Sequence, residues 1–343
     1  MRAAYIHGIR DVRMGELPEP EAGGQELKLK VSVVGVCGSD VHYYVEGGIG
    51  LDRLKDPFVP GHEFAARICD EAAAEYGYAQ GQLVAVDPAR PCGKCVRCHG
   101  GHPNLCMNMV FRGGTPNSGA LTEYVSAPPS AIFPVAEGTT PVEVAMMEPL
   151  GIAVHAVGLA KIRLMENIAV LGCGPIGLCL IQLARASGAD NIFAVDPLPH
   201  RREAALKMGA DKAGPSYESV AEWTDGYGVD LVLEATNDGN AYEQSGEIIR
   251  LGGRVILAGI PDGGHYGLES FQLRRKGATV KRVRRMGHVY PTCINLVARG
   301  LVDLEAIGTH RFSLEETNAA FELQAERTDG VLKAMVWPNG FEG

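Results

Sequence analysis

The sequence predicts an α/β protein in which a β-rich first third precedes a doubly wound, parallel sheet. Apolar residues alternate with polar ones over residues 27–36, which is typical of a half-buried strand. From about Met146 onward, β-branched runs alternate with helical segments, and this βαβ pattern indicates parallel strands joined by crossover helices. The chain has 343 residues, enough for roughly two domains. The change of periodicity places the boundary near residue 150.

Short apolar runs bounded by Gly, Pro and Asp define further strands in the first third, at residues 64–68, 83–86 and 122–126. The second part contributes strands at 168–171, 192–195, 231–234 and 254–258, and helices at 176–187 and 200–208. The last segments predict helices at 290–299 and 314–326 and a closing strand at 333–337. No internal repeat or low-complexity linker interrupts this order.

The charge balance argues against a polyanionic partner. Lysine and arginine total 32 against 41 aspartate and glutamate residues, so the net charge of −9 repels nucleic acid. The longest uncharged stretch, residues 167–184, is interrupted by three glycines and Pro175, and it predicts a buried strand turning into a helix rather than a membrane span. Residues 1–16 lack the apolar run of a signal peptide, so we expect a cytoplasmic protein with no membrane partner.

Four of the nine cysteines crowd into one loop, with the sequence PCGKCVRCHGGHPNLC. Their spacing is C-x2-C-x2-C-x7-C, formed by Cys92, Cys95, Cys98 and Cys106. Four thiolates on so short a loop can close a tetrahedral shell around zinc, and a closed shell leaves no position for chemistry. An iron–sulfur cluster is the rival, but the ferredoxin run places its fourth cysteine after three residues and before proline. The spacing favours structural zinc over that cluster and over four unrelated thiols.

A dinucleotide fingerprint follows the strand predicted at residues 168–171. Gly172, Gly174 and Gly177 form G-x-G-x-x-G between that strand and the next helix. The first glycine permits a tight turn, the second lets backbone approach a pyrophosphate, and the third lets helix and strand pack closely. The alternative is a packing turn in another kind of α/β protein. Asp196 favours the dinucleotide interpretation, because it ends the next strand about 20 residues on, where an acid can accept both ribose hydroxyls.

The carboxylate of Asp196 also bears on the choice of cofactor. A negative charge there repels a 2′-phosphate and so favours NAD over NADP. Arg201 leaves NADP open, because an arginine five residues later can bind that phosphate, stack on adenine or remain in solvent. The predicted cofactor-binding residues are Gly172, Gly174, Pro175, Ile176, Gly177, Asp196, Arg201 and Ala258.

Three dispersed segments carry further residue types that bind metals. They are VCGSD with Cys37, PGHEF with His62 and Glu63, and MEPL with Glu148. Taken singly, a cysteine at a strand end is commonly a small buried hydrophobe, and a lone histidine is commonly a hydrogen-bonded structural residue. The segments also lie too far apart in sequence to form a local metal finger. Their order along the chain is what makes these residues candidates.

The ordered motifs GVCGSDVHYY, PGHEF, the four-cysteine loop, MEPL, GCGPIG and VD resemble those of the zinc-dependent medium-chain dehydrogenase/reductase family. Within it they resemble the polyol dehydrogenases of the sorbitol, xylitol and L-idonate type, over essentially the whole chain. The resemblance implies a split GroES-like catalytic domain at residues 1–150 and 286–343, with a Rossmann NAD-binding domain at residues 151–285 between its parts. It also suggests a homotetramer.

The resemblance assigns a catalytic zinc to Cys37 and His62, with Glu63 as the third protein ligand and water completing the shell. Glu148 stands where other alcohol dehydrogenases of the family have a second cysteine. It is therefore expected beside the metal, directly or through water, and which glutamate binds in the resting state stays open. A zinc with three protein ligands keeps one position for the substrate oxygen and lowers the pKa of the bound hydroxyl. Hydride then passes from the carbinol carbon to the nicotinamide.

Three further residues are implied at the active site. Ser39 resembles the hydroxyl that begins the family's proton relay, although a serine capping the following helix is an alternative. Tyr43 matches the substrate-side loop, where a phenol can hydrogen-bond a polyhydroxylated chain, and a half-buried core aromatic is its alternative. Arg285 aligns with an arginine that helps organise the site. Met286 follows it in place of an aromatic residue, and two neighbouring arginines leave open a shifted register or a solvated basic face.

The sequence therefore predicts a zinc-dependent enzyme that oxidises a secondary hydroxyl of a polyol to the ketose, reversibly, with NAD. A sugar-acid (L-idonate-type) or L-threonine-type dehydrogenase would use the same zinc and hydride chemistry. A zinc-free quinone reductase shares the fold, but Cys37, His62 and the cysteine loop argue against it. The non-enzymatic alternative is an NAD-binding sensor with a structural zinc. The expected partner is a small polyol or sugar acid.

Overall fold

The computed structural model describes residues 1–22, 25–267 and 270–341 and forms two compact units. Unit 1 comprises Met1–Glu148, Tyr290–Arg299 and Leu304–Gly343, and unit 2 comprises Pro149–Val289 and Gly300–Asp303. The chain thus leaves unit 1 after residue 148 and returns to it from residue 290. Across the described residues, no helix has both the length and the apolar character needed to cross a bilayer.

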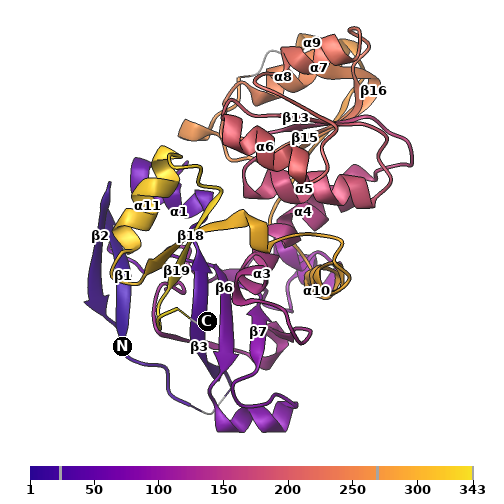
Figure 1. The fold of residues 1–343 in the computed structure, drawn as a ribbon. Coiled ribbons are helices and arrows are strands. Elements are labelled where there is room, and N and C mark those ends of the chain that lie inside the picture. The colour runs from indigo at the N-terminus through magenta and orange to yellow at the C-terminus, as the bar shows by residue number, and fades with distance from the viewer. Residues whose placement is uncertain (23–24, 268–269, 342–343) are drawn as a thin grey trace. The chain divides into compact units, whose positions relative to one another are not determined.

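Unit 1 is built on a seven-stranded sheet. Its strand order is β11 (Ile132–Pro134), β7 (Leu83–Val86), β6 (Glu63–Ile68), β3 (Leu27–Gly35), β19 (Lys333–Trp337) and β18 (Gly308–Ser313), with β10 (Tyr124–Ala127) also paired to β3. All pairs are antiparallel except β18 with β19. The last strand therefore lies against one of the first, so the C-terminal segment completes the sheet of the N-terminal part (Figure 1).

Unit 1 also contains elements outside this sheet, among them three two-stranded sheets. The strands are β1 (Arg2–Gly8), β2 (Asp11–Glu16), β4 (Gly48–Ile49), β5 (Asp52–Arg53), β8 (Ala89–Arg90) and β9 (Val110–Phe111). The helices are α1 (Gly38–Glu46), α2 (Val96–His99), α3 (Pro141–Ala145), α10 (Tyr290–Ala298) and α11 (Thr317–Glu326), and α4 (Met147–Ala160) begins here. Helix α1 follows β3 directly and ends at Gly47, whose φ of 70° is the left-handed turn that glycine accepts best.

Unit 2 contains a six-stranded, fully parallel sheet. Its order is β14 (Lys212–Gly214), β13 (Ile192–Val195), β12 (Ile168–Leu171), β15 (Val229–Glu234), β16 (Ile249–Leu257) and β17 (Thr279–Arg282). Counted along the chain, this is the 3-2-1-4-5-6 order of a dinucleotide-binding sheet. The order reverses between β12 and β15, and ligands bind such sheets at the carboxyl ends of the strands beside the reversal.

The helices of unit 2 are α5 (Pro175–Ala186), α6 (Pro199–Lys207), α7 (Glu218–Trp223), α8 (Ala241–Ile248) and α9 (Phe271–Arg275). All four residues of β12 are buried, as expected for a parallel strand covered on both faces. The predicted α/β fold is confirmed. The predicted strands at 83–86, 168–171, 192–195 and 333–337 and the predicted helices at 176–187, 200–208, 290–299 and 314–326 agree with the structure to within a few residues. The sequence did not reveal β1, β2, β14 and β17. Strands β14 and β17 are short and lie at sheet edges, and β1 and β2 form a separate two-stranded sheet.

Candidate metal and cofactor sites

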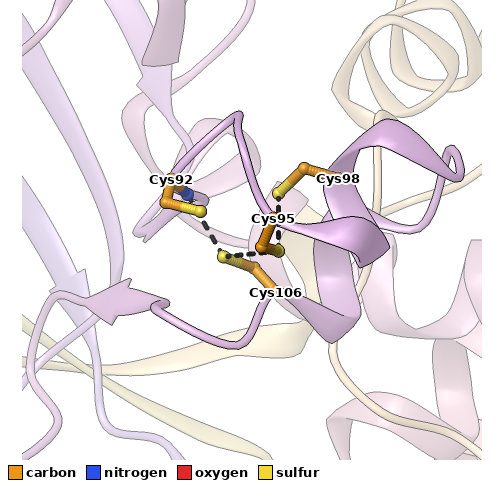
Figure 2. A group of neighbouring side chains, drawn as sticks. All are labelled: Cys92, Cys95, Cys98 and Cys106. Carbon is orange, nitrogen blue, oxygen red and sulfur yellow. Dashed lines mark hydrogen bonds between the residues drawn. The ribbon is translucent and has the colours of Figure 1, made fainter.

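An exposed loop of unit 1 brings four cysteine sulfurs together (Figure 2). The sulfurs of Cys92, Cys95, Cys98 and Cys106 all lie within 4.8 Å of one another, and the Sγ–Sγ distance is 3.6 Å from Cys95 to Cys98 and 3.9 Å from Cys95 to Cys106. A zinc–sulfur bond of about 2.3 Å gives a tetrahedron with edges of about 3.8 Å. The four free thiols therefore have the spacing of a zinc shell.

Local backbone groups prepare this loop for a cation. The sulfur of Cys106 accepts hydrogen bonds from the N–H groups of Cys92 at 3.2 Å and Asn108 at 3.4 Å. Backbone N–H groups, that of Met107 first, lower the pKa of Cys95 to about 6, which favours the thiolate that binds metal. Helix α2 in the middle of the loop has no buried side chain, so metal binding rather than an apolar core would hold the loop together.

A second metal-ligand group is assembled from paired strands of unit 1. Cys37 follows β3, His62 directly precedes the neighbouring β6, and Glu63 begins β6 as the register partner of Gly35. Ligand atoms of Cys37, His62 and Glu63 lie within 4.8 Å of one another, and both His62 and Glu63 are buried. The sheet thus brings together the residues predicted as zinc ligands, from segments 25 positions apart. Glu148, in the first turn of α4, is buried but lies outside this group.

Ser39 lies beside this group. Its hydroxyl donates to the sulfur of Cys37 at 3.2 Å and is 3.5 Å from Nε2 of His62. Cys37 is the N-cap of α1 and the cap makes no side-chain hydrogen bond, so the alternative of Ser39 as a helix cap is wrong. The position of Ser39 also shows that Nε2 of His62 faces the cysteine.

Asp40 is a site residue that sequence reasoning missed. Its Oδ1 is 3.6 Å from Nδ1 of His62, on the opposite side of the ring from Cys37. Oδ2 of Asp40 and Nδ1 of His62 are buried without a hydrogen-bond partner. Histidines that bind metals commonly donate their second N–H to a carboxylate, which fixes the tautomer and the ring. Asp40 is in the GSD part of the motif, but only the fold places it against His62.

The second group carries an excess of buried acidic residues. Asp40, Glu63 and Glu148 are each at most 5% exposed. Burial raises the pKa of Asp40 to about 6 and that of Glu148 to about 7, since charged carboxylates lose their hydration there. A divalent cation would compensate such a cluster, so the donor set fits zinc.

Lys333 is a second residue that sequence reasoning missed, because it opens an otherwise apolar strand. Its Nζ is 2.6 Å and 2.9 Å from the two carboxylate oxygens of Glu63 and donates to the carbonyl of Val36 at 3.1 Å. Lys333 and Glu63 are both 2% exposed. The acidic cluster therefore already contains one buried cation.

Tyr43 is a core aromatic residue whose hydroxyl is hydrogen-bonded. Its ring is buried in the core of unit 1 and packs edge-on against Phe58, with centroids 5.1 Å apart. Its hydroxyl donates to Asp52 at 2.8 Å, and the second oxygen of Asp52 accepts from Thr115 at 3.1 Å. Burial raises the pKa of Tyr43 to about 12, so the phenol keeps its proton.

The glycine motif of unit 2 has the shape of a cofactor cradle. A Cβ on Gly172 would lie 2.8 Å from the carbonyl of Ala235, and one on Gly177 would lie 1.8 Å from the carbonyl of Gly172, so both glycines are required by packing. A Cβ on Gly174 would meet only the Arg201 guanidinium, at 3.7 Å. The protein itself does not require this glycine, and the open space before the N-terminus of α5 suits a pyrophosphate.

Asp196 and Arg201 lie at this cradle. The carboxylate of Asp196 is buried and accepts from the N–H groups of Cys173 and Leu198, both at 2.9 Å. Nη1 of Arg201 is 3.8 Å from that carboxylate. Pro175 and Ile176 form the partly exposed first turn of α5. The fold thus brings the predicted glycines, the acid and the arginine together.

Glu234 is a third missed residue, at the carboxyl end of β15. Its oxygens accept from the N–H and hydroxyl of Thr236 at 2.6 and 2.8 Å, from the N–H of Gly259 at 3.1 Å and from the hydroxyl of Tyr266 at 3.1 Å. Glu234 therefore connects the loops after β15 and β16. The N–H of Ala258, a predicted cofactor-binding residue, donates to the backbone carbonyl of Glu234 at 2.8 Å.

Arg285, predicted to organise the active site, belongs to unit 2, whereas the metal-ligand candidates belong to unit 1. It follows β17 by three residues and has a left-handed φ of 53°.

A closed cysteine site, a buried group of three metal ligands and a dinucleotide cradle together define a metal-dependent dehydrogenase.

Comparisons with known proteins agree with this class. The family profile "Alcohol dehydrogenase GroES-like domain" matches residues 23–137, and "Zinc-binding dehydrogenase" matches residues 175–299. A sorbitol dehydrogenase of Bacillus subtilis (strain 168) is 33% identical and covers 99% of this chain and 98% of the relative. An L-threonine 3-dehydrogenase of Caldanaerobacter subterraneus subsp. tengcongensis is 34% identical over 93% of each chain.

A solved structure extends the likeness to the whole fold. A zinc-binding dehydrogenase from Sinorhizobium meliloti 1021, bound to NADP, superposes with a TM-score of 0.87 at 27% identity, covering 98% of this chain and 99% of the other. The chain belongs to the zinc-dependent medium-chain dehydrogenase/reductase family, in its polyol dehydrogenase subgroup. It is an alcohol dehydrogenase whose cofactors are zinc and a nicotinamide dinucleotide.

Proposed function

We propose that this enzyme oxidises a secondary hydroxyl of a polyol to the ketose, reversibly, with NAD as the hydride acceptor. The observation that carries the proposal is the buried group of Cys37, His62 and Glu63 in unit 1. Three protein ligands leave a position for a substrate oxygen, unlike the four cysteines of the loop. In this proposal residues 1–150 and 286–343 form the catalytic domain, residues 151–285 form the cofactor domain, and the enzyme is a homotetramer.

The residues of unit 1 divide the work of binding and proton transfer. Cys37, His62 and Glu63 would hold the catalytic zinc, with Glu148 beside it. The zinc, when bound, polarises the substrate hydroxyl and makes its proton easier to remove. The hydroxyl of Ser39 borders both Cys37 and His62, so it is placed to take up that proton.

The residues of unit 2 favour NAD. The nicotinamide, when bound, accepts the hydride. Asp196 offers a buried carboxylate beside the glycine cradle, and a 2′-phosphate would meet its charge at close range. Nη1 of Arg201 lies 3.8 Å from that carboxylate. The carboxylate offsets the positive charge of Arg201, and a 2′-phosphate would need that charge.

Polar groups around Tyr43 support a polyol rather than a sugar acid. The Tyr43 phenol donates to Asp52, which also accepts from Thr115, so two hydroxyls and a carboxylate gather there. Hydroxyls of a polyol can hydrogen-bond such groups, whereas like-charge repulsion from Asp52 opposes a carboxylate on the substrate. The match to a sorbitol dehydrogenase over nearly the whole chain supports the same choice.

The test is NAD reduction by the purified enzyme with sorbitol, xylitol, L-idonate and L-threonine, before and after treatment with a zinc chelator. We expect turnover of a polyol that is lost on chelation and restored by added zinc. Turnover of L-threonine or L-idonate alone would overturn the polyol assignment and keep the zinc chemistry. Turnover that resists removal of the zinc, verified by metal analysis, would overturn the mechanism.

A further inference from the structure

Gly35 opens a gap through which two charged side chains meet across the central strand of unit 1. Strand β3 runs between β6 and β19, so Glu63 on β6 and Lys333 on β19 come from opposite sides of it. A Cβ on Gly35 would lie 2.5 Å from Oε2 of Glu63 and 3.4 Å from Cδ of Lys333. Any side chain at residue 35 would therefore occupy the place of this ion pair.

The ion pair fixes both oxygens of Glu63. Lys333 contacts one oxygen at 2.6 Å and the other at 2.9 Å, and its third contact is the carbonyl of Val36, next to Cys37 in sequence. A lysine bound in this way has no freedom to swing aside. The carboxylate of Glu63 is thus held at one position and one orientation, within reach of Cys37 and His62.

Burial makes this pair indispensable to Glu63. Both partners are 2% exposed, so bulk water screens neither charge. Removing one member of a buried ion pair leaves the other uncompensated, which is strongly unfavourable. Without Lys333, the charge of Glu63 would add to those of the neighbouring Asp40 and Glu148, with which it interacts electrostatically.

We propose that Lys333 is a positioning residue for the catalytic zinc, acting through Glu63 and the gap at Gly35. It orients the Glu63 carboxylate as a metal ligand and offsets the negative charge that accumulates there. The inference rests on the zinc site of the proposed function and adds an outer partner to it. Loss of such a partner commonly costs 10- to 100-fold in metal affinity.

The test compares Lys333→Met with the unchanged enzyme by equilibrating each with graded chelator and counting bound zinc. We expect about a 10- to 100-fold weaker catalytic zinc, with the cysteine-loop zinc unchanged. Gly35→Ala keeps Lys333 but displaces the Glu63 carboxylate, so it should weaken the same zinc. Lys276→Met is the matched control, because Lys276 binds two backbone carbonyls, at 2.7 and 2.9 Å, in unit 2.

A double variant tests whether Lys333 acts through Glu63. In a Glu63→Gln background, Lys333→Met should have no additional effect on catalytic zinc affinity. An equal additional loss would overturn the proposal, as would unchanged zinc affinity in both Lys333→Met and Gly35→Ala, even with a lower melting temperature. His62→Ala distinguishes failure of this inference from failure of the proposed zinc site. If His62→Ala also leaves both zinc ions bound, the proposed catalytic site itself is wrong.

Discussion

The two metal sites of unit 1 are built in opposite ways. The cysteine loop draws four identical ligands from 15 consecutive residues and has little buried surface of its own. The Cys37 site draws three different ligands from the ends of two paired strands and is buried among further acids and a lysine. The first has the ligands of a closed shell, and the second leaves room for a substrate oxygen.

The two sites obtain their geometry from different levels of structure. In the cysteine loop, short-range spacing places the ligands and the metal would supply the stability. In the buried site, the sheet places the ligands, and outer residues such as Asp40 and Lys333 orient them. Loss of the first site should therefore affect the loop, whereas loss of the second should affect catalysis.

The largest effect is expected from His62→Ala. Without this ligand the catalytic zinc should be lost and turnover should fall by far more than the roughly 100-fold that an outer partner costs. Zinc analysis should find one ion per chain in place of two, with NAD affinity and melting temperature close to normal. His155→Ala, on α4, is the control. Substantial turnover in His62→Ala would remove the distinction between the two sites.

Cys95→Ser should break the other site and leave the catalytic one. The loop zinc should be lost, and trypsin should cleave near Lys94 and Arg97 more than about 100-fold faster, since a binding free energy of order 10 kcal/mol holds such loops. Turnover per remaining catalytic zinc should stay near normal. The control is Cys69→Ser, a free cysteine outside the loop. Resistance of Cys95→Ser to trypsin would mean that the loop is stable without metal.

Asp40→Asn tests whether a residue outside the ligand group affects only the catalytic zinc. The asparagine keeps the shape but removes the charge that faces Nδ1 of His62, so catalytic zinc affinity should fall by about tenfold. Chelator competition measures the change, and the loop zinc should be unaffected. Asp70→Asn, another buried aspartate of unit 1 that caps a 3-10 helix, serves as control. Equal losses in both variants would point to a general effect on the unit.

The smallest effect on metals is expected from Asp196→Ser, which lies in unit 2 and should leave both zinc ions bound. Removal of the carboxylate should raise the KM for NAD and shift the NADP/NAD ratio of kcat/KM toward NADP by about tenfold or more, because like-charge contacts cost several kcal/mol. Asp211→Ser is the control, because Asp211 accepts from the N–H of Ile192 at the start of β13, whereas Asp196 follows the end of that strand. An unchanged ratio would mean that Asp196 does not face the ribose.

Sequence reasoning succeeded where the signal is local. The cysteine spacing, the glycine motif with Asp196, and the apolar strands such as β12 and β13 are patterns within a few dozen residues, and the structure contains each of them. Strands β17 and β2 carry no such pattern, because none of their residues is fully buried. Strand β1 does bury Ala3, Ala4 and Ile6, and the sequence prediction missed it.

The residue types and their spacing are readable from the sequence alone: four thiols on one loop, three glycines before a helix, and a cysteine, a histidine and glutamates in a recognisable order. The fold shows that Asp40 faces His62, that Lys333 reaches Glu63 through the gap at Gly35, and that an oxygen of Glu63 lies within 4.8 Å of ligand atoms of Cys37 and His62. These contacts join segments far apart in the chain, and the pairing of β3 with β6 and β19, not local spacing, brings the segments together.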